Sequence, residues 1–411
     1  MDDQLRIAFI HPDLGIGGAE QLVINLAIAL QNQGHYVKIY TPYHNPNHCF
    51  KETKDGTLNV EVRGSCFPSH IFGKFVAFCA YIRMILAALY IIFYGGYYDC
   101  IIVDQVSVCV PLLRLFRRKV LFYCHFPDKL LCVERRSIFK RFYRFFLDFF
   151  EEITLIPANL ILVNSHFTQG IFYANFPILK RLKTPTEVLY PSIDLKKFDS
   201  QELNEKPSEK SDFITEPFFL SLNRYERKKN INLAIEAFAK FKEKNEKSPV
   251  KLVIAGGYDP RLPENVQHKN ELEESAKKLK VFDCVSFKIN VNDEERCYLL
   301  KNALALLYTP ENEHFGIVPL EAQYMETPVL ASNSGGPKET VVEKETGFLL
   351  SKKPEDWAEK MQILAQETKL REEMGKNGKE NVLNKFSFKA FANFTDEFVK
   401  KTIGLKEKKK N

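Results

Sequence analysis

The first forty residues restrict the fold more than any other part of the chain. An apolar run at 5–10 precedes a glycine-rich loop at 11–18, and apolar residues then recur at helical spacing over 19–33. Gly34 is a C-cap signal, and a second apolar run follows at 37–41. This order of strand, loop, helix and strand is a βαβ unit, which predicts a parallel sheet with helices packed on its faces.

The alternation of strands and helices continues along the chain. Further strands are expected at 100–103, 120–123, 160–163, 218–222, 251–255, 285–288, 305–308 and 329–331. Helices are expected at 231–243, 264–280 and 386–403. This pattern is typical of α/β proteins.

A change of composition separates the pattern into two halves. Residues 200–216 are rich in Glu, Lys, Ser, Asp and Pro and nearly lack apolar side chains, which is typical of an exposed linker. A chain of 411 residues is also long enough for two domains. We therefore predict an α/β protein with two Rossmann-like doubly wound domains. The expected parts are 1–199, a linker at 200–216, 217–385, and a C-terminal helix and basic tail at 386–411.

Composition excludes several other classes of protein. The net charge of +6 is too small for a dedicated nucleic-acid-binding protein. The nine cysteines include no Cys-x-x-Cys pair, which favours buried thiols in a reducing compartment over disulfides or a zinc site. The N-terminus lacks the basic and apolar regions of a signal peptide, so we expect the folded domains to face the cytosol.

Two segments indicate contact with a membrane. Residues 75–94 are almost entirely apolar, interrupted by Arg83, and their length just reaches that of a bilayer span. A span would divide one sheet between two sides of the membrane, so we expect either a helix at the membrane interface or an ordinary helix that covers the sheet. Residues 135–153 place phenylalanines on one helical side and basic residues on another, which predicts a second interfacial helix. A core-facing aromatic stripe is the alternative for this segment.

The segment from Glu313 to Glu321 carries the most specific chemical signal. Its two glutamates are separated by seven residues, and the motif E-H-F-G-x-x-x-L-E follows the strand expected at 305–308. Loops at the carboxyl ends of parallel strands bind ligands, and amides at a helix start favour phosphate. We expect a nucleotide-linked ligand to contact both glutamates and four residues between them, namely Phe315, Gly316, Ile317 and Val318.

A basic cluster follows the strand expected at 218–222. Arg224 and Lys229 can converge on a diphosphate, and fixed cations can neutralise the charge that grows on a departing nucleoside diphosphate. The sequence contains no Asp-x-Asp pair, the arrangement with which many transferases hold a divalent metal ion. We therefore expect cationic side chains to hold the diphosphate and neutralise its charge, with no metal and no other cofactor.

Three further features lie at expected strand ends. Gly17 and Gly18 allow the backbone to approach a phosphate or a sugar closely at a helix start. His125 can hydrogen-bond a transferred sugar, and a structural histidine is the alternative. Gly256 is expected to line the nucleotide site.

Together these residues resemble the retaining glycosyltransferases of the GT-B fold and GT4 type, which have two facing Rossmann-like domains with a cleft between them. The resemblance covers essentially the whole chain. More narrowly, eight segments are similar to those of the eukaryotic dolichol-pathway α-1,3/1,6-mannosyltransferases: HPDLGIGGAEQLV, YCHFPDKLL, LILVNSHFT, VLYPSID, LSLNRYERKKN, AGGYDPR, NEHFGIVPLEA and NSGGPKE.

The resemblance implies a specific reaction. GDP-mannose would be the donor and mannosyl-chitobiosyl-diphosphodolichol the acceptor. Sequential α-1,3 and α-1,6 transfers would occur with retention of configuration at the cytosolic face of the endoplasmic reticulum membrane. Carried over by position, Glu313 would support charge at the anomeric centre with His125 nearby, and Glu321 would bind ribose hydroxyls. Arg224 and Lys229 would hold the diphosphate.

The resemblance also sets expectations for partners. Gly17 and Gly18 would approach the reaction centre from the opposite domain. Some relatives carry an apolar C-terminal hairpin and none follows Phe386 here, so we expect membrane attachment through 67–98 and 135–153. Other dolichol-pathway mannosyltransferases are further candidate partners. Two alternatives stay open: a related GT-B enzyme with another nucleotide sugar or lipid acceptor, and a catalytically silent nucleotide-binding scaffold at the membrane.

Overall fold

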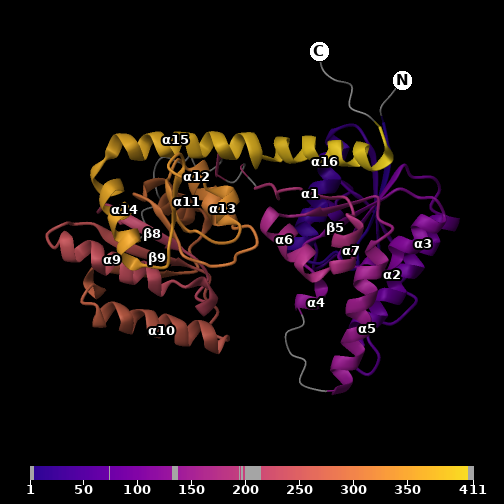
Figure 1. Cartoon of the computed structure of the whole chain (residues 1–411), viewed down its shortest axis with the longest axis horizontal. Helices are drawn as coiled ribbons and strands as arrows, with labels where there is room; N and C mark the ends of the chain where they lie inside the picture. Colours follow the sequence, from indigo (N-terminus) through magenta and orange to yellow (C-terminus); the bar gives the residue numbers. More distant parts are fainter. Residues whose placement is uncertain are drawn as a thin grey trace, which may run out of the picture. The chain divides into compact units, whose positions relative to one another are not determined.

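The structure is a computed structural model that describes residues 4–73, 75–131, 138–193, 195, 198–199 and 214–405. It divides into two compact units (Figure 1). Unit 1 comprises residues 1–192 together with 389–411, and unit 2 comprises residues 193–388. The linker expected at 200–216 lies outside the described residues except for its last three positions.

Unit 1 is built on a seven-stranded parallel sheet in the order β3-β2-β1-β4-β5-β6-β7. Its strands are β1 (Arg6–Ile10), β2 (Tyr36–Thr41), β3 (Asn59–Val62), β4 (Cys100–Asp104), β5 (Val120–Cys124), β6 (Leu160–Val163) and β7 (Thr186–Val188). Strands β4, β5 and β6 are buried along their whole length, as parallel strands between two layers of helices are. All strands point the same way, so their carboxyl ends lie along one edge of the sheet.

The helices of unit 1 connect consecutive strands of this sheet. They are α1 (Gly18–Asn32), α2 (Val76–Phe93), α3 (Val110–Leu115), α4 (Asp128–Leu131), α5 (Ile138–Leu155), α6 (His166–Asn175) and α7 (Pro177–Leu182), with the 3-10 turns η1 (Lys51–Thr53) and η2 (Ser107–Cys109).

The C-terminal helix α16 (Phe388–Ile403) completes unit 1. A carboxylate oxygen of Asp396 lies 2.8 Å from Nε2 of His35, and Asn393 accepts a hydrogen bond of 3.1 Å from Gln33. The last helix of the chain therefore belongs to the first Rossmann-like unit, although the whole of unit 2 precedes it in sequence.

Unit 2 repeats the design with a six-stranded parallel sheet in the order β10-β9-β8-β11-β12-β13. Its strands are β8 (Phe218–Leu222), β9 (Lys251–Gly256), β10 (Val285–Ile289), β11 (Leu306–Tyr308), β12 (Val329–Ser332) and β13 (Gly347–Leu350). Its helices and 3-10 turns are η3 (Arg227–Lys229), α9 (Asn232–Lys244), α10 (Pro263–Lys278), η4 (Phe282–Cys284), α11 (Asp293–Asn302), α12 (Ile317–Tyr324), α13 (Pro337–Thr340), α14 (Pro354–Gln366) and α15 (Thr368–Lys385).

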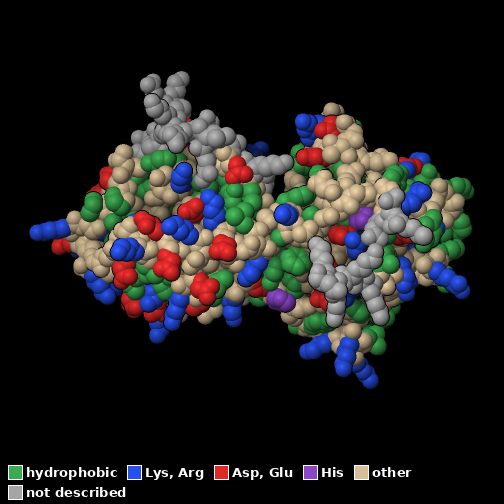
Figure 2. Space-filling model, turned by 90° about the horizontal axis from the view of Figure 1, so that it is seen from above, with side chains coloured by type: hydrophobic (Ala, Val, Ile, Leu, Met, Phe, Trp, Pro, Cys, Tyr) green, Lys and Arg blue, Asp and Glu red, His purple; other side chains and the backbone are tan. Residues whose placement is uncertain are grey.

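The surface of unit 2 carries charges of both signs. On the face that carries α15, Figure 2 shows Lys and Arg side chains interspersed with Asp and Glu side chains. This mixture gives that face no continuous basic surface, which agrees with the small net charge of the chain.

All the predicted strands and helices are present, with ends that differ by a few residues. Three strands, β3, β7 and β13, were not predicted, and each lies at an edge of its sheet. An edge strand has one neighbour instead of two, and β3 and β7 are only partly buried. Their weaker apolar pattern follows from that position.

Helix α2 is long and apolar enough to cross a membrane by length and composition alone. Four of its side chains, Met84, Ala87, Ala88 and Ile91, are fully buried in the core of unit 1. One side of α2 therefore covers the sheet, as one of the two interpretations predicts. In total 28% of the helix is buried, and much of its opposite side is partly exposed.

Helix α5 exposes apolar side chains and buries charged ones, which is the reverse of an ordinary surface helix. Five phenylalanines are exposed to solvent by 43–66%: Phe142, Phe145, Phe146, Phe149 and Phe150. Three charged residues, Arg144, Glu151 and Glu152, are buried at 6–7% exposure. The core-facing aromatic stripe is therefore the wrong interpretation, because charged side chains occupy the side of α5 that faces the protein.

These buried charges have partners on neighbouring elements. The Arg144 guanidinium donates hydrogen bonds of 2.9 Å to the carboxylates of Asp128 and Asp148. Glu151 accepts hydrogen bonds from the backbone amides of Asp128 and Lys129 at 2.7 and 3.0 Å, at the start of α4. Burial raises the pKa of Glu151 to about 7. The polar side of α5 is thus fixed to unit 1, and its aromatic side stays free.

Candidate active site

In unit 2, Glu313 and Lys229 meet at the carboxyl edge of the sheet. Glu313 lies in the loop after β11, and Lys229 lies in η3, after β8, which is the neighbour of β11. The Lys229 ammonium group forms an ion pair with the Glu313 carboxylate, and their side chains are 12% and 27% exposed. The hydroxyl of Tyr308 donates a hydrogen bond of 3.4 Å to the same carboxylate. The sequence predicted both residues, and the structure brings them together.

Two glycines hold the Glu313 loop in place. The amide of Gly336 donates a hydrogen bond of 2.7 Å to the carbonyl of Glu313. A Cβ at Gly336 would lie 2.2 Å from the carbonyl oxygen of Phe315, and Gly335 has a φ of +63°. Only glycine permits so close an approach of two backbones, so this contact fixes the loop after β11.

The residues between the two glutamates form the start of α12. Gly316 precedes the helix with a φ of +85°, Phe315 is buried, and Ile317 is 47% exposed. Val318 is partly buried in the first turn. Burial lowers the pKa of His314, so its imidazole is neutral at pH 7. The backbone amides of the first helical turn have the geometry that can bind an anion.

Glu321 is buried on the inner side of α12. It is 5% exposed and forms an ion pair with the guanidinium of Arg296, from α11. Arg296 was not among the predicted site residues, and the sequence offered no signal for it beyond its charge. The ion pair with Arg296 therefore fixes the position of the Glu321 carboxylate.

Arg224 and Gly256 lie at neighbouring strand ends. Arg224 follows β8, is 63% exposed, and lies 3.1 Å from the carboxylate of Glu226. Glu226 also lies 3.0 Å from the ammonium group of Lys228. Gly256 ends β9 with a φ of +151°, and a Cβ there would lie 1.9 Å from the carbonyl oxygen of Asn223. The strand ends of β8 and β9 therefore pack backbone against backbone beside an exposed Arg224.

In unit 1, three adjacent strands each bring one ionisable residue to the carboxyl edge. His11 follows β1, Asp104 ends β4, and His125 follows β5. Nδ1 of His11 lies 2.8 Å from one carboxylate oxygen of Asp104, and Nε2 of His125 lies 2.9 Å from the other. Nε2 of His11 lies 3.8 Å from the carboxylate of Glu20, in the first turn of α1.

The charges in this cluster are fixed by their mutual contacts. Burial alone would lower the pKa of His11, but the carboxylates of Asp104 and Glu20 outweigh it and raise that pKa to about 9. Burial alone would raise the pKa of Asp104, but His125 and His11 hold it at about 2. The contact with His11 lowers the pKa of Glu20. At pH 7 the cluster therefore contains an imidazolium on His11 and two carboxylates.

The glycine loop of unit 1 lies beside this cluster. Gly17 is the N-cap of α1, and a Cβ there would lie 2.3 Å from Oε2 of Glu20. A Cβ at Gly18 would have no atom within 4 Å. The predicted residues Gly17, Gly18 and His125 thus share one edge, but His11, Asp104 and Glu20 were not predicted. A polar residue at the end of an apolar strand was the signal that could have found His11 and Asp104.

Among the residues that the structure describes, no group of three His, Cys, Asp or Glu side chains is arranged to hold a metal ion. All the described cysteines are free thiols.

Two family models match the chain, and the gap between them lies a few residues after the boundary between the two units. Glycosyltransferase Family 4 matches residues 16–197, and Glycosyl transferases group 1 matches residues 204–381. Together they cover both Rossmann-like sheets except for β1, which precedes the first matched residue.

Curated relatives match over nearly the whole chain. The alpha-1,3/1,6-mannosyltransferase ALG2 of Dictyostelium discoideum is 46% identical over 97% of this chain and 99% of its own length. The protein of the same name from Homo sapiens is 42% identical over 97% of this chain and 96% of its own length.

Solved structures share the fold. A glycosyltransferase from Rickettsia africae aligns with a TM-score of 0.70 and 20% identity, covering 98% of this chain and all of that one. The sucrose-phosphate synthase of Thermosynechococcus elongatus aligns with a TM-score of 0.68 and 21% identity, over the same shares of both chains. The protein has the two-domain GT-B fold of glycosyltransferases, and by sequence it belongs to the ALG2 family of alpha-1,3/1,6-mannosyltransferases.

Proposed function

We propose that this chain transfers mannose from GDP-mannose to mannosyl-chitobiosyl-diphosphodolichol, adding an α-1,3 and an α-1,6 mannose with retention of configuration. Membership of the ALG2 family supports the donor and acceptor. The structural observation that supports the chemistry best is the ion pair of Lys229 with Glu313 at the carboxyl edge of unit 2. It places a fixed cation and a carboxylate side by side, as transfer of a sugar from a nucleoside diphosphate requires.

The cation at this edge stabilises the leaving group. When the bond to the anomeric carbon breaks, negative charge grows on the GDP diphosphate, and a fixed ammonium group nearby stabilises it. Lys229 takes this role, and the exposed guanidinium of Arg224 can swing onto the same phosphates. In this proposal no metal ion takes part in the transfer.

The two carboxylates at this edge interact with the transferred sugar and with the ribose of the nucleotide. Positive charge develops at the anomeric carbon as the leaving group departs, and the Glu313 carboxylate stabilises it. The buried carboxylate of Glu321, held by Arg296, accepts hydrogen bonds from the ribose hydroxyls. The backbone amides at the start of α12, beside Gly316 and Ile317, bind phosphate oxygens.

A transfer assay tests the proposal directly. The full chain receives GDP-mannose and a synthetic mannosyl-chitobiosyl-diphosphate lipid in detergent with a chelator, and mass spectrometry counts the added hexoses. We expect two added mannoses without a divalent metal. Addition that requires a metal would refute the metal-free mechanism. Transfer of a sugar from another nucleotide sugar, with no transfer from GDP-mannose, would show that GDP-mannose is not the donor.

Removing either cation of the proposed diphosphate site should weaken use of the donor. We expect Lys229→Ala to lower kcat/KM for GDP-mannose by about 100-fold, because a charge that stabilises the leaving group is lost. We expect Arg224→Ala to lower it by about tenfold, because Arg224 is more exposed and its contact more screened. Steady-state kinetics with varied GDP-mannose measure both effects. Lys240→Ala, which removes an exposed lysine on α9, is the control. Unchanged donor kinetics in both variants would remove these residues from the diphosphate site.

The aromatic side of α5 is proposed as the membrane-facing surface of unit 1. We define the α5 face as Phe142, Phe145, Phe146, Phe149 and Phe150. One aromatic residue before α2 extends it: Phe75 is 49% exposed and lies edge-on to the ring of Tyr143, from α5, with the ring centroids 5.7 Å apart. A contiguous exposed apolar surface of this kind marks an interaction site, and a lipid-linked acceptor places that site at a membrane.

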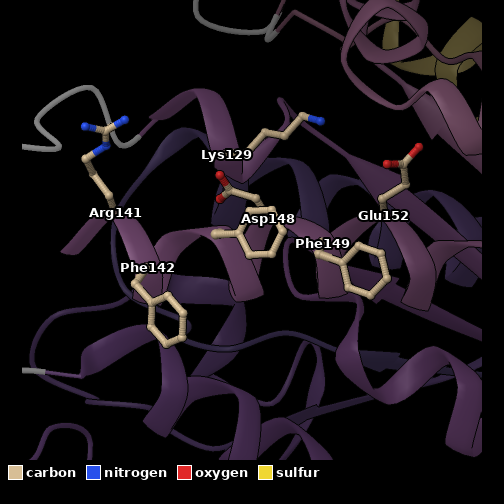
Figure 3. A pocket seen from close by; sticks show the side chains of 7 residues that line it. Lys129, Arg141, Phe142, Asp148, Phe149 and Glu152 are labelled. Atoms are coloured by element: carbon tan, nitrogen blue, oxygen red, sulfur yellow. The ribbon is translucent and has the colours of Figure 1, made fainter. Parts of the chain in front are cut away.

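A hollow in the α5 face joins aromatic and charged side chains. It has a volume of about 680 Å³ and is lined by Lys129, Arg141, Phe142, Phe145, Asp148, Phe149 and Glu152. Figure 3 shows the ends of Arg141 and Glu152 pointing away from the rings of Phe142 and Phe149. Aromatic rings beside a basic side chain suit the boundary between lipid tails and anionic headgroups. We place this surface on the cytosolic side of the endoplasmic reticulum membrane, where the free cysteines would stay reduced.

Liposome flotation checks the membrane surface. We expect the full chain to float with vesicles that contain anionic lipid, and Phe145→Ser/Phe149→Ser to remain mostly in the soluble fraction. The double variant should fold normally, because both rings are exposed by about half. Phe394→Ser, at an aromatic residue that is 45% exposed on α16, serves as the control and should float like the wild type. Complete recovery of the wild type in the soluble fraction would contradict the proposed surface.

A further inference from the structure

Two side-chain hydrogen bonds join the ends of three neighbouring strands in unit 2. Strands β8, β11 and β12 lie next to one another in the sheet; η3 follows β8, Thr309 directly follows β11, and Ser332 is the last residue of β12. The hydroxyl of Thr309 donates a hydrogen bond of 2.9 Å to the backbone carbonyl of Lys229. The hydroxyl of Ser332 donates one of 2.9 Å to the backbone carbonyl of Thr309. The two bonds connect β12 with the backbone of Lys229.

Both hydroxyls are buried, and each has a backbone carbonyl as its partner. Thr309 is fully buried and Ser332 is 5% exposed. Lys229 is the last residue of η3, and the chain leaves this turn at Asn230 with a φ of +49°. Carbonyls at the end of a helical turn lack a partner within the turn. The Thr309 hydroxyl supplies that partner, and it thereby fixes the backbone from which the Lys229 side chain extends.

The end of β12 also holds the other member of the ion pair. The amide of Gly336 donates a hydrogen bond of 2.7 Å to the backbone carbonyl of Glu313. The segment 332–336 therefore holds the Glu313 backbone directly and the Lys229 backbone through Thr309. The relative position of the ammonium group and the carboxylate thus depends on this one strand end.

We propose that Thr309 is a positioning residue for Lys229, and that Ser332 in turn orients Thr309. The inference rests on the proposed mannosyl transfer, in which Lys229 stabilises the departing diphosphate. A lysine side chain is flexible, so its ammonium group stays in place only if its backbone does. A displacement of about 1 Å within a reacting site can cost about 100-fold in rate. Thr309 and Ser332 act through Lys229 and touch no substrate.

The test replaces Thr309 with valine, which has nearly the same shape and lacks the hydroxyl. We expect kcat/KM for GDP-mannose to fall about tenfold, because the Lys229 backbone is no longer fixed. Thr309→Ser keeps the donated hydrogen bond and should come within about threefold of the wild type. The matched control is Thr327→Val, since Thr327 is a buried threonine of unit 2 whose hydroxyl donates to the carbonyl of Leu300. This control should leave kcat/KM unchanged.

A double-mutant cycle separates positioning from a general loss of stability. Lys229→Ala lacks the group that Thr309 positions, so adding Thr309→Val should lower kcat/KM by less than about twofold more. A merely structural role would make the two effects multiply. If Thr309→Val does not fold, Ser332→Ala takes its place in the same cycle. It should lower kcat/KM about threefold in the wild type and leave Lys229→Ala unchanged.

Calorimetric titration with GDP alone distinguishes this inference from the function on which it rests. The affinity for GDP should fall in Lys229→Ala and in Thr309→Val, and the double variant should be no weaker than Lys229→Ala. If the wild type binds GDP but transfers no sugar from any nucleotide donor, the proposed function is overturned and the GDP cycle still decides the role of Thr309. Wild-type kcat/KM in Thr309→Val, or effects that multiply, would overturn the positioning role while mannosyl transfer stands. A wild type that neither transfers sugar nor binds GDP would overturn both.

Discussion

Replacing Glu313 with alanine should lower kcat for mannose transfer by about 100- to 1000-fold, the loss that follows removal of one well-placed group from a charge-stabilising site. The carboxylate is held against the developing positive charge by its ion pair with Lys229 and its hydrogen bond from Tyr308. Its removal also leaves the Lys229 ammonium group without this carboxylate. The loss should therefore appear in kcat more than in KM for GDP-mannose, because the stabilised charge exists only in the transition state.

The fold should survive this substitution. The Glu313 side chain is 27% exposed, and the backbone contact that fixes its loop, from Gly336 to the Glu313 carbonyl, is kept in alanine. Glu311→Ala is a matched control, because Glu311 lies in the same loop, is also 27% exposed and also pairs with a lysine, Lys352. Both variants should melt within a few degrees of the wild type. Turnover at the wild-type rate in Glu313→Ala would remove the residue from the reaction.

Replacing Asp104 with asparagine should destabilise unit 1 by about 3 kcal/mol at pH 7, because it removes the nearer and fully buried of the two carboxylates that pair with His11. The loss should depend on pH. The pKa of His11 is raised from 6.5 to about 9 in the folded chain, so its contribution to stability is complete below about pH 6.5 and is lost as the pH rises through about 9. In the wild type the stability of unit 1 should fall over that window, and in Asp104→Asn the same window should be nearly flat.

Hydrogen exchange of peptides from β1, β4 and β5 at several pH values measures this effect in unit 1. The fluorescence of Trp357, fully buried in the core of unit 2, reports that unit separately and should change little. Asp396→Asn is the control, since it removes the carboxylate from another His–Asp pair of unit 1, with an aspartate that is 16% exposed. A wild-type profile in Asp104→Asn would show that Asp104 does not hold the charge on His11.

The local pattern of the chain was enough to predict most of its strands, several of its helices and the strand ends where the candidate residues lie. Apolar runs and helical spacing depend on neighbours within a few residues, so they can be recognised in the sequence. Glycines and charged residues in the segments that end or follow such runs placed Gly17, Arg224, Gly256 and Glu313 at the carboxyl ends of strands before the order of the strands was known. The missed strands β3, β7 and β13 lie at sheet edges, where burial is lower or pairing is one-sided.

Tertiary structure alone decided which of these residues meet. Lys229 and Glu313 are 84 positions apart, and they pair because β8 and β11 are neighbours in the sheet. His11 and Asp104 are 93 positions apart and meet for the same reason through β1 and β4.

The orientation of α5 could not be predicted from the sequence either. An amphipathic pattern shows that a helix has two sides, but it does not show which side faces the protein. Buried partners such as Asp128 for Arg144 decide that, and they come from elsewhere in the chain. The sequence determined the elements because their signals are local. Only the tertiary structure determined the clusters and the exposed aromatic side, because contact and burial depend on residues that are distant along the chain.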